Sequence, residues 1–142
     1  MTPAQVKSIQ ESFAKVAPIA DAAAALFYGR LFELAPEVKP LFRGDMTKQG
    51  RKLMKTLTVV VNGLGNLEAI LPAASALAKG HVAYGVKPSH YTPVGEALLW
   101  TLERGLGADW TPELKGAWTS AYSTLANFMI GEAYGSAAAA AE

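Results

Sequence analysis

Residues 47–64 of the chain read TKQGRKLMKTLTVVVNGL, and this stretch decides the fold class. Its apolar side chains recur at the spacing of one face of an α-helix, at Leu53, Leu57, Val60, Val61 and Leu64. Asp45 or Thr47 can cap the start of this helix, and the glycines at positions 63 and 65 stop it. We therefore predict an amphipathic helix over residues 47–64.

The sequence on both sides of this stretch has the same helical character. Thr2, Pro3 and Gln5 have the pattern of a capped helix start, and Thr111 with Pro112 repeats the combination of cap and proline. Further helices are predicted over residues 3–16, 19–34, 67–81, 89–106 and 111–134, with a short turn-like segment at 36–42. We find no strand alternation, repeat or linker, so we predict one all-α domain of about seven helices in residues 1–134. Residues 135–142 form an Ala-rich tail that could fray or extend the last helix.

The composition argues against several classes of function. Half of the 142 residues are apolar, which is enough for one buried core, and 13 basic residues nearly balance 12 acidic ones. Nucleic acid is therefore not an expected partner. The chain has no cysteine, which removes disulfides, zinc–thiolate sites, iron–sulfur clusters and thiol nucleophiles. We see neither a secretory signal nor an apolar run of the roughly 20 residues that a bilayer requires, and expect a cytoplasmic protein with no membrane contact.

The chain has two histidines, and each could be a ligand or an ordinary residue. His81 lies one turn after Leu77, at the edge of a predicted apolar face. An imidazole in an apolar cavity is costly unless it is bonded, and a haem iron would satisfy it. A structural or solvated histidine is the alternative. His90 lies beside Pro88 and Ser89 at a predicted helix start, where we expect an exposed side chain.

Two more polar residues lie among apolar ones. Gln49 shares a helix face with Leu53, and Lys52 lies on the flank of that face. Gln49 is either a polar group that enters an apolar site or a solvated residue near a helix start. Tyr28 lies among apolar residues at positions 27, 31 and 32, where a core tyrosine bonds its hydroxyl to some partner that spacing does not identify.

Taken together, these residues resemble a globin. The resemblance covers about residues 2–134 and is closest to neuroglobin-like bacterial globins and to the globin half of flavohaemoglobins. It rests on Pro36 with Leu41 and Phe42, on the run from Gln49 to Met54, on His81 with residues 84–86, and on residues 94–99 and 118–122. The separations of six residues from Pro36 to Phe42 and of 32 from Gln49 to His81 match those of the family. The resemblance implies a three-over-three helical sandwich around haem b (iron protoporphyrin IX).

The resemblance also implies a role for each site residue. His81 would be the proximal ligand of the iron, and Tyr28 with Gln49 would be the polar pair on the opposite, distal side. Gly50 would be the small residue at which two helices cross closely, or else simply a flexible residue. The other implied pocket residues are Phe42 stacked on the porphyrin, Lys52 near a propionate, Leu53 as the apolar distal residue, and Val86, Tyr91 and Val94 along the walls.

The distal pair departs from most globins, which have a histidine where this chain has Gln49. Glutamine is a poor iron ligand and no other histidine is placed to bind there, so we expect an open sixth position on ferrous iron. Bound oxygen carries partial negative charge, so donors from Tyr28 and Gln49 should stabilise it and slow its release. The two side chains could instead bond each other or water.

Flavohaemoglobins, which oxidise nitric oxide to nitrate, have the same Tyr–Gln pair. The chain ends where their flavin and NADH domains would begin, so we expect turnover to need a separate reductase. Their proximal histidine pairs with a tyrosine and a glutamate. Tyr91 has the expected separation from His81, but Glu132 falls about one residue out of register, which puts a peroxidase-like push on the iron in doubt.

Three functions remain open at this point. The first is binding of small gases, with oxygen, nitric oxide and carbon monoxide as possible ligands, for storage, delivery or sequestration of oxygen. The second is a nitric oxide dioxygenase that works with a separate reductase. The third is a haem-free interaction domain with a globin-like fold. Whether the protein is an enzyme is left open, and no residue is assigned a catalytic role beyond the distal pair.

Overall fold

Six α-helices build the described part of the chain. The computed structural model describes residues 2–42, 44–83 and 87–141, with side chains for all of these except residues 82–83 and 133–141. The helices are α1 (Pro3–Val16), α2 (Ala20–Leu34), α3 (Met46–Asn62), α4 (Leu67–Ala83), α5 (Tyr91–Leu106) and α6 (Pro112–Ala141). Short 3-10 helices adjoin them: η1 (Ala17–Ile19), η2 (Pro36–Leu41), η3 (Leu64–Asn66), η4 (Pro88–His90) and η5 (Gly107–Asp109). The all-α prediction is confirmed.

The helix starts follow the capping residues of the sequence. The Gln5 amide donates to Thr2 Oγ1 at 3.2 Å, and the Thr2 amide donates to Gln5 Oε1 at 3.0 Å, which completes a capping box on α1. The Leu114 amide donates to Thr111 Oγ1 in the same way on α6. At α3 the cap is Asp45, whose Oδ1 accepts from the Thr47 amide at 2.8 Å.

Several helix ends differ from the predictions; α3, for example, covers residues 46–62 rather than 47–64. A 3-10 turn, η4, precedes α5, so α5 begins at Tyr91 rather than near Ser89. The predicted turn at residues 36–42 contains the 3-10 helix η2, in which Pro40 lacks the amide that a longer α-helix would use. α6 runs through the Ala-rich tail to Ala141, since alanine has the highest helix propensity, and the tail extends the last helix.

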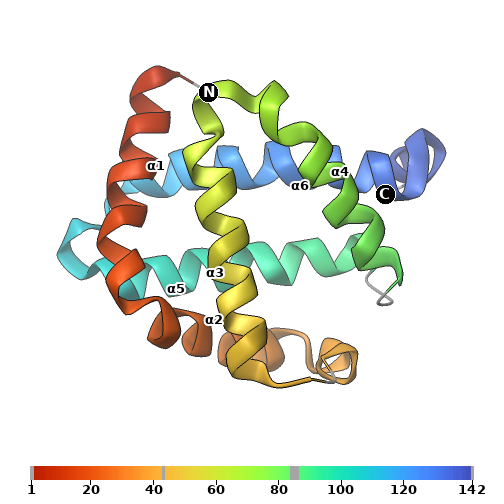
Figure 1. Cartoon of the computed structure of the whole chain (residues 1–142), viewed down its shortest axis with the longest axis horizontal. Coiled ribbons are helices and arrows are strands. Elements are labelled where there is room, and N and C mark those ends of the chain that lie inside the picture. Colours follow the sequence, from red (N-terminus) through yellow and green to blue (C-terminus); the bar gives the residue numbers. More distant parts are fainter. Residues whose placement is uncertain (1, 43, 84–86, 142) are drawn as a thin grey trace.

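The helices form two crossed layers. α3 crosses in front of α5 and α6, with α1 on one side and α4 on the other (Figure 1). α2 packs on both α5 and α3, whereas α4 packs chiefly on α6. The crossing of α2 and α3 is close at Gly50, where an added Cβ would lie 2.9 Å from the Cβ of Ala24. Gly50 therefore fits its predicted role at a close helix crossing.

Two clusters of buried side chains make up the core. The larger one joins α1, α2, α3, α5 and α6 around the fully buried Ile9, Val16 and Leu31. The smaller one joins α4, α5 and α6 around Ala78 and Met129. Tyr122 packs against both clusters, so it connects α4 to the rest of the molecule.

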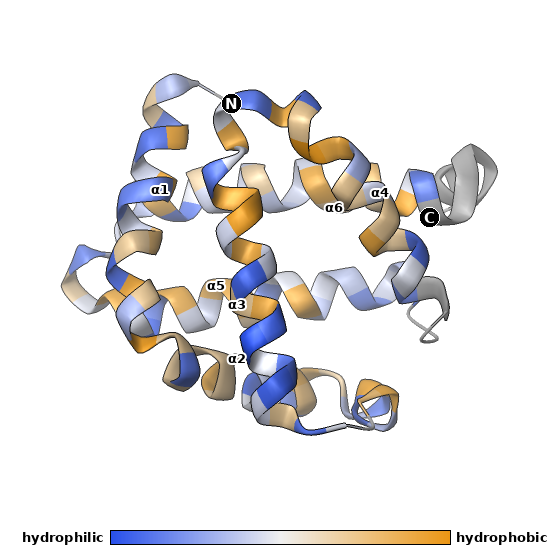
Figure 2. Ribbon diagram, viewed as in Figure 1, coloured by the Kyte–Doolittle hydropathy of each residue, from blue (hydrophilic) through white to orange (hydrophobic). Residues whose placement is uncertain are grey.

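Hydropathy varies along single helices as well as around them. Figure 2 shows α3 hydrophilic over its N-terminal half and largely hydrophobic toward its C-terminal end. Within the described residues no single helix has both the length and the apolar character to cross a bilayer; Met46–Asn62 and Leu64–His81 meet that test only as a bent pair, by length and composition.

Candidate functional site

Tyr28 and Gln49 are brought together although they lie 21 residues apart. Gln49 Nε2 on α3 donates to the hydroxyl oxygen of Tyr28 on α2 at 3.3 Å. The close crossing at Gly50 permits this approach because Gly50 directly follows Gln49 and contacts α2. Burial raises the pKa of the Tyr28 hydroxyl above its ordinary value, an effect that the Gln49 hydrogen bond partly offsets. The phenol is therefore protonated at neutral pH, and its own hydrogen is not used in the bond with Gln49.

Phe42 adjoins this pair from the residue that follows η2. Its ring lies edge-on to Tyr28, with the ring centroids 5.2 Å apart, and packs similarly against Phe32 at 5.5 Å. Phe27 contacts the other side of the Tyr28 ring at 5.0 Å. The aromatic cluster holds the phenol in place and leaves the Phe42 ring half-buried, as a residue that stacks on a planar group should be.

The face of α3 that carries Gln49 continues as an apolar wall. Leu53, Leu57 and Val60 are half-buried on this face, and Val94 of α5 is half-buried too. A small cavity of about 20 Å³ lies behind Leu53, with Phe27, Leu98 and Thr101 among its lining residues. Lys52 is exposed at the edge of the wall, where a long cation can reach an acidic group bound beside it.

His81, the predicted proximal ligand, lies on α4. Its ring is half-buried, and Nδ1 lies 3.5 Å from the Tyr91 hydroxyl. Burial lowers the pKa of His81 below its ordinary value, so the imidazole is neutral at physiological pH and has a lone pair for a metal. Tyr91 is held in turn, because the hydroxyl of Tyr122 donates to the Tyr91 carbonyl at 2.6 Å.

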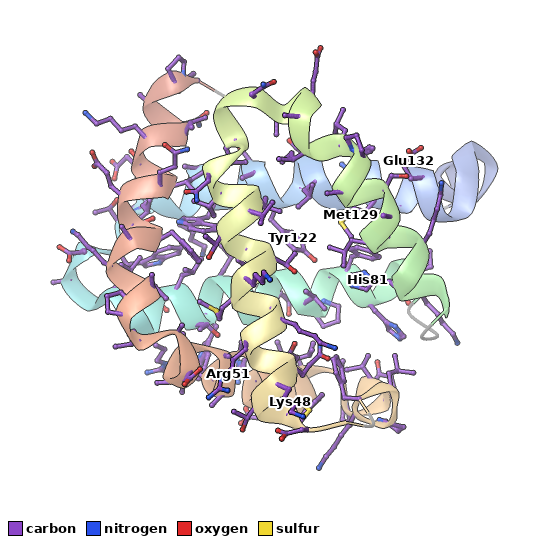
Figure 3. All side chains as sticks on the ribbon, in the orientation of Figure 1. Lys48, Arg51, His81, Tyr122, Met129 and Glu132 are labelled. Atoms are coloured by element: carbon purple, nitrogen blue, oxygen red, sulfur yellow. The ribbon has the colours of Figure 1, made fainter. Side chains whose placement is uncertain are left out.

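Glu132 does not take the place of a proximal acid. It is exposed on α6, whereas Met129, one turn earlier, is buried in the smaller core cluster with Tyr91 (Figure 3). The register argument against Glu132 therefore agrees with its position. Val86, the remaining pocket residue implied by the resemblance, lies outside the described residues.

The other histidine has a structural role. His90 Nδ1 accepts a hydrogen bond from the Lys87 amide at 3.0 Å, which caps the turn η4. Its side chain is half-buried rather than exposed, because this bond folds it back onto the backbone. His90 is thus accounted for without a ligand.

Sequence reasoning did not identify Tyr122 and Gly95 as a supporting pair. An added Cβ on Gly95 would lie 2.6 Å from Cε2 of Tyr122, so the phenol ring packs directly on the backbone of α5. Burial and the neighbouring Tyr91 raise the pKa of Tyr122, which therefore keeps the proton that it donates to the Tyr91 carbonyl. Both residues were part of the resemblance, but nothing in the spacing pairs a glycine with a tyrosine 27 residues later.

The arrangement fits a flat metal-containing cofactor. No three of the His, Asp and Glu side chains in the described ranges gather to hold a metal ion on their own. His81 is a single neutral imidazole, and the half-buried apolar residues Leu53, Phe42 and Val94 suit the faces of a porphyrin, which supplies the other metal ligands itself. The fold and these side chains define a helical protein whose residues fit a haem, with the His81 imidazole available to its iron.

The comparisons with known proteins give the family. The globin sequence model matches residues 25–129, and the chain belongs to the globin family. Three curated relatives are flavohemoproteins. The one from Rhodopirellula baltica is 33% identical over 129 residues, which cover 89% of this chain and 32% of that protein. Those from Halalkalibacterium halodurans and Vibrio cholerae are 36% and 34% identical over 107 residues, which cover 73% of this chain and 26% and 27% of those proteins. The chain spans about a third or less of the length of these relatives. They are haemoproteins, and the cofactor of this chain is haem b.

Solved structures agree with this assignment. A bacterial globin from Campylobacter jejuni is 27% identical with a TM-score of 0.81, over 93% of this chain and 96% of that one. An engineered carbene transferase, described as a putative nitric oxide dioxygenase from Rhodothermus marinus, is 27% identical with a TM-score of 0.86, over 100% and 99%. The three-over-three globin fold is thereby confirmed, and the protein is a gas-binding haem globin.

Proposed function

We propose that the protein binds oxygen and other small gases and releases oxygen slowly, in storage, delivery or sequestration. Haem b supplies the iron at which a gas ligand binds, with His81 as the protein ligand. The observation that carries the proposal is the Gln49 Nε2 to Tyr28 Oη distance of 3.3 Å, which gathers two donor side chains at one point of the apolar site.

The two side chains still have donors to offer a ligand. Gln49 uses one N–H of its amide on Tyr28, and the Tyr28 hydroxyl hydrogen and the second amide hydrogen are not used in that bond. Because the site is apolar, each hydrogen bond to a partly negative ligand contributes on the order of 1–3 kcal/mol. Two such bonds together, at about 2–6 kcal/mol, slow release by about 30-fold or more, since about 1.4 kcal/mol corresponds to a factor of ten.

The test is the oxygen dissociation rate of Tyr28→Phe and Gln49→Leu, measured by stopped-flow displacement with carbon monoxide. Each variant should release oxygen about fivefold faster or more, because it loses one donor. Gln10→Leu is the matched control: Gln10 donates to the Val61 carbonyl at the far end of α3, so its loss should leave the rate unchanged. Wild-type rates in both distal variants would refute the proposal.

Nitric oxide dioxygenation with a separate reductase is the second candidate. The flavohemoprotein relatives and the nitric oxide dioxygenase neighbour favour it, and the distal pair suits it equally. The oxygenated protein should be mixed with nitric oxide with and without a reductase and NADH. Sustained consumption of nitric oxide only with the reductase would establish the enzyme, whereas a single stoichiometric reaction would leave the protein as an oxygen binder.

A haem-free interaction domain, the third function that the sequence left open, finds no support. The relatives are haemoproteins, and the residues of this site fit the cofactor. Absorbance of the purified protein at the haem bands tests this point directly.

A further inference from the structure

The outward face of α3 is strongly basic. Lys48, Arg51, Lys52 and Lys55 lie within eight consecutive residues, and α3 holds none of the twelve acidic residues of the chain. All four side chains are exposed. Arg51 has a loose ion pair with Asp21 at 3.9 Å, in which both side chains are about 70% exposed, so it offsets little of the charge. Figure 3 shows Lys48 and Arg51 at the N-terminal end of α3.

An exposed apolar residue continues the same face. Lys48, Lys52, Lys55 and Val59 follow one another at steps of four, three and four residues, which places them in one row along a helix. Val59 is 50% exposed, the highest value among the large apolar side chains of the described residues. A basic row with an exposed apolar residue beside it offers an acidic partner both electrostatic steering and an apolar contact.

This row lies next to the haem site. Gln49 and Leu53, which belong to the site, are one residue away from Lys48 and Lys52 on the same helix. An α-helix with its side chains is only about 10–12 Å across, so a protein seated on the row comes within one helix width of the site. A redox group at the edge of such a partner would be well placed to exchange electrons with the haem.

We propose that Lys48, Arg51, Lys52, Lys55 and Val59 form the docking face for the electron donor of this globin, a flavoprotein with carboxylates around its exposed flavin. This inference rests on the proposed function, because a globin that oxidises its iron in either role must be reduced again. In the step, one electron leaves the reduced flavin, which becomes the semiquinone, and ferric iron becomes ferrous without any bond forming. Opposite charges steer such an encounter and raise its rate by about 10- to 1,000-fold at low salt.

The test is the second-order rate at which an acidic flavodoxin, in its hydroquinone form, reduces the ferric holoprotein without oxygen. The wild-type rate should fall at least about tenfold between low and high salt. Lys48→Glu, Arg51→Glu and Lys55→Glu together should slow reduction by about as much at low salt. Lys52 is left intact because the resemblance implies that it also contacts a haem propionate, so its loss could disturb the haem as well as docking.

The matched control reverses Lys7, Lys15 and Lys115 to glutamate. These exposed residues belong to α1 and α6. Their reversal gives the same net charge as the triple substitution of Lys48, Arg51 and Lys55, which we call the docking variant. The control should be reduced at nearly the wild-type rate. Val59→Ser, which changes no charge, should slow reduction several-fold at high salt, where steering is screened.

Direct binding separates docking from the haem chemistry. Addition of oxidised flavodoxin to the ¹⁵N-labelled carbon monoxide complex should shift amide signals of α3, and the docking variant should abolish the shifts. Equal slowing of the docking and control variants, no salt dependence, or shifts elsewhere would overturn the proposal. The proposal would also be overturned if the docking variant no longer bound phosphatidylglycerol vesicles but was reduced at the wild-type rate. That result would assign the face to a lipid surface. The oxygen dissociation rate tests the proposed function independently, because these substitutions spare Tyr28 and Gln49.

Discussion

At the scale of single residues, the site depends on where a few polar groups point. Spacing placed Tyr28 among apolar neighbours and Gln49 on an apolar face, but it could not say that one donates to the other. A hydrogen bond between residues on different helices depends on the crossing of those helices, which local periodicity does not contain. The resemblance to the globins implies only that both residues lie on the distal side of a haem. The structure shows that they bond each other, which the sequence left open as an alternative to bonds with a ligand.

The protonation of Tyr28 gives a prediction about pH. Its pKa lies above the ordinary value of 10.0 because burial disfavours the phenolate, so the donor form persists throughout the neutral and mildly alkaline range. The stabilisation from the buried neutral phenol is fully present below pH 10.0 and is lost only as the pH rises through the raised pKa. The oxygen dissociation rate of the wild type should therefore be constant between about pH 7 and pH 9. A rise in the rate with a midpoint in that interval would contradict the protonated donor.

The two histidines differ in role, and substitution should separate them. His81→Ala removes the neutral imidazole of the site, so purified protein should lose most of its haem, measured as the ratio of haem to protein absorbance. His90→Ala is the control, because His90 bonds to the Lys87 amide and caps a turn. Normal haem content and spectra in His81→Ala would show that another residue binds the iron.

At the scale of helices, the sequence predicts that a helix exists more accurately than it predicts the residues at which the helix begins and ends. Proline and capping residues identified the starts of α1 and α6 because their bonds are local. The start of α5 was predicted too early because η4 uses His90 to cap its own turn, a contact that competes with a regular α-helix. Tertiary packing sets the remaining features, among them the fit of Gly95 against Tyr122.

That fit can be measured by a pair of glycine substitutions. Gly95→Ala forces a Cβ to within 2.6 Å of the Tyr122 ring, which is held by its bond to the Tyr91 carbonyl, so it should lower the free energy of unfolding by about 1–3 kcal/mol. Gly116→Ala on α6 meets nothing within 4 Å and should instead gain up to about 1 kcal/mol from helix propensity. Urea denaturation of both variants gives the comparison. Equal effects would mean that the close approach costs nothing.

At the scale of the whole molecule, the core is uneven. The larger cluster joins five helices, whereas α4 is held mainly by α6 through small residues such as Ala74 and Ala78. Composition predicted one core large enough for the chain, but not that it divides in two. His81 and the apolar wall of α3 belong to helices that pack on different neighbours, α4 on α6 and α3 on α2.

Removal of haem should therefore loosen one part of the protein first. Haem stabilises the folded state by binding to it, and α4, which carries the proposed ligand His81, is held by the smaller cluster. In the haem-free protein, hydrogen exchange should be faster in α4 than in α2 and α5, which pack closely on each other. Equal protection of α4 and α2 would contradict this expectation.

The bond between Gln49 and Tyr28 has one further consequence. Because the Tyr28 oxygen accepts from Gln49, the hydroxyl hydrogen and the second amide hydrogen are left for a ligand. The affinity for a gas should accordingly depend on how well the bound gas accepts a hydrogen bond. Bound oxygen is a good acceptor and is stabilised by both donors, whereas carbon monoxide is a poor acceptor and is hardly stabilised. Selectivity between two diatomic molecules of nearly equal size would then come from one glutamine's orientation toward its neighbouring phenol.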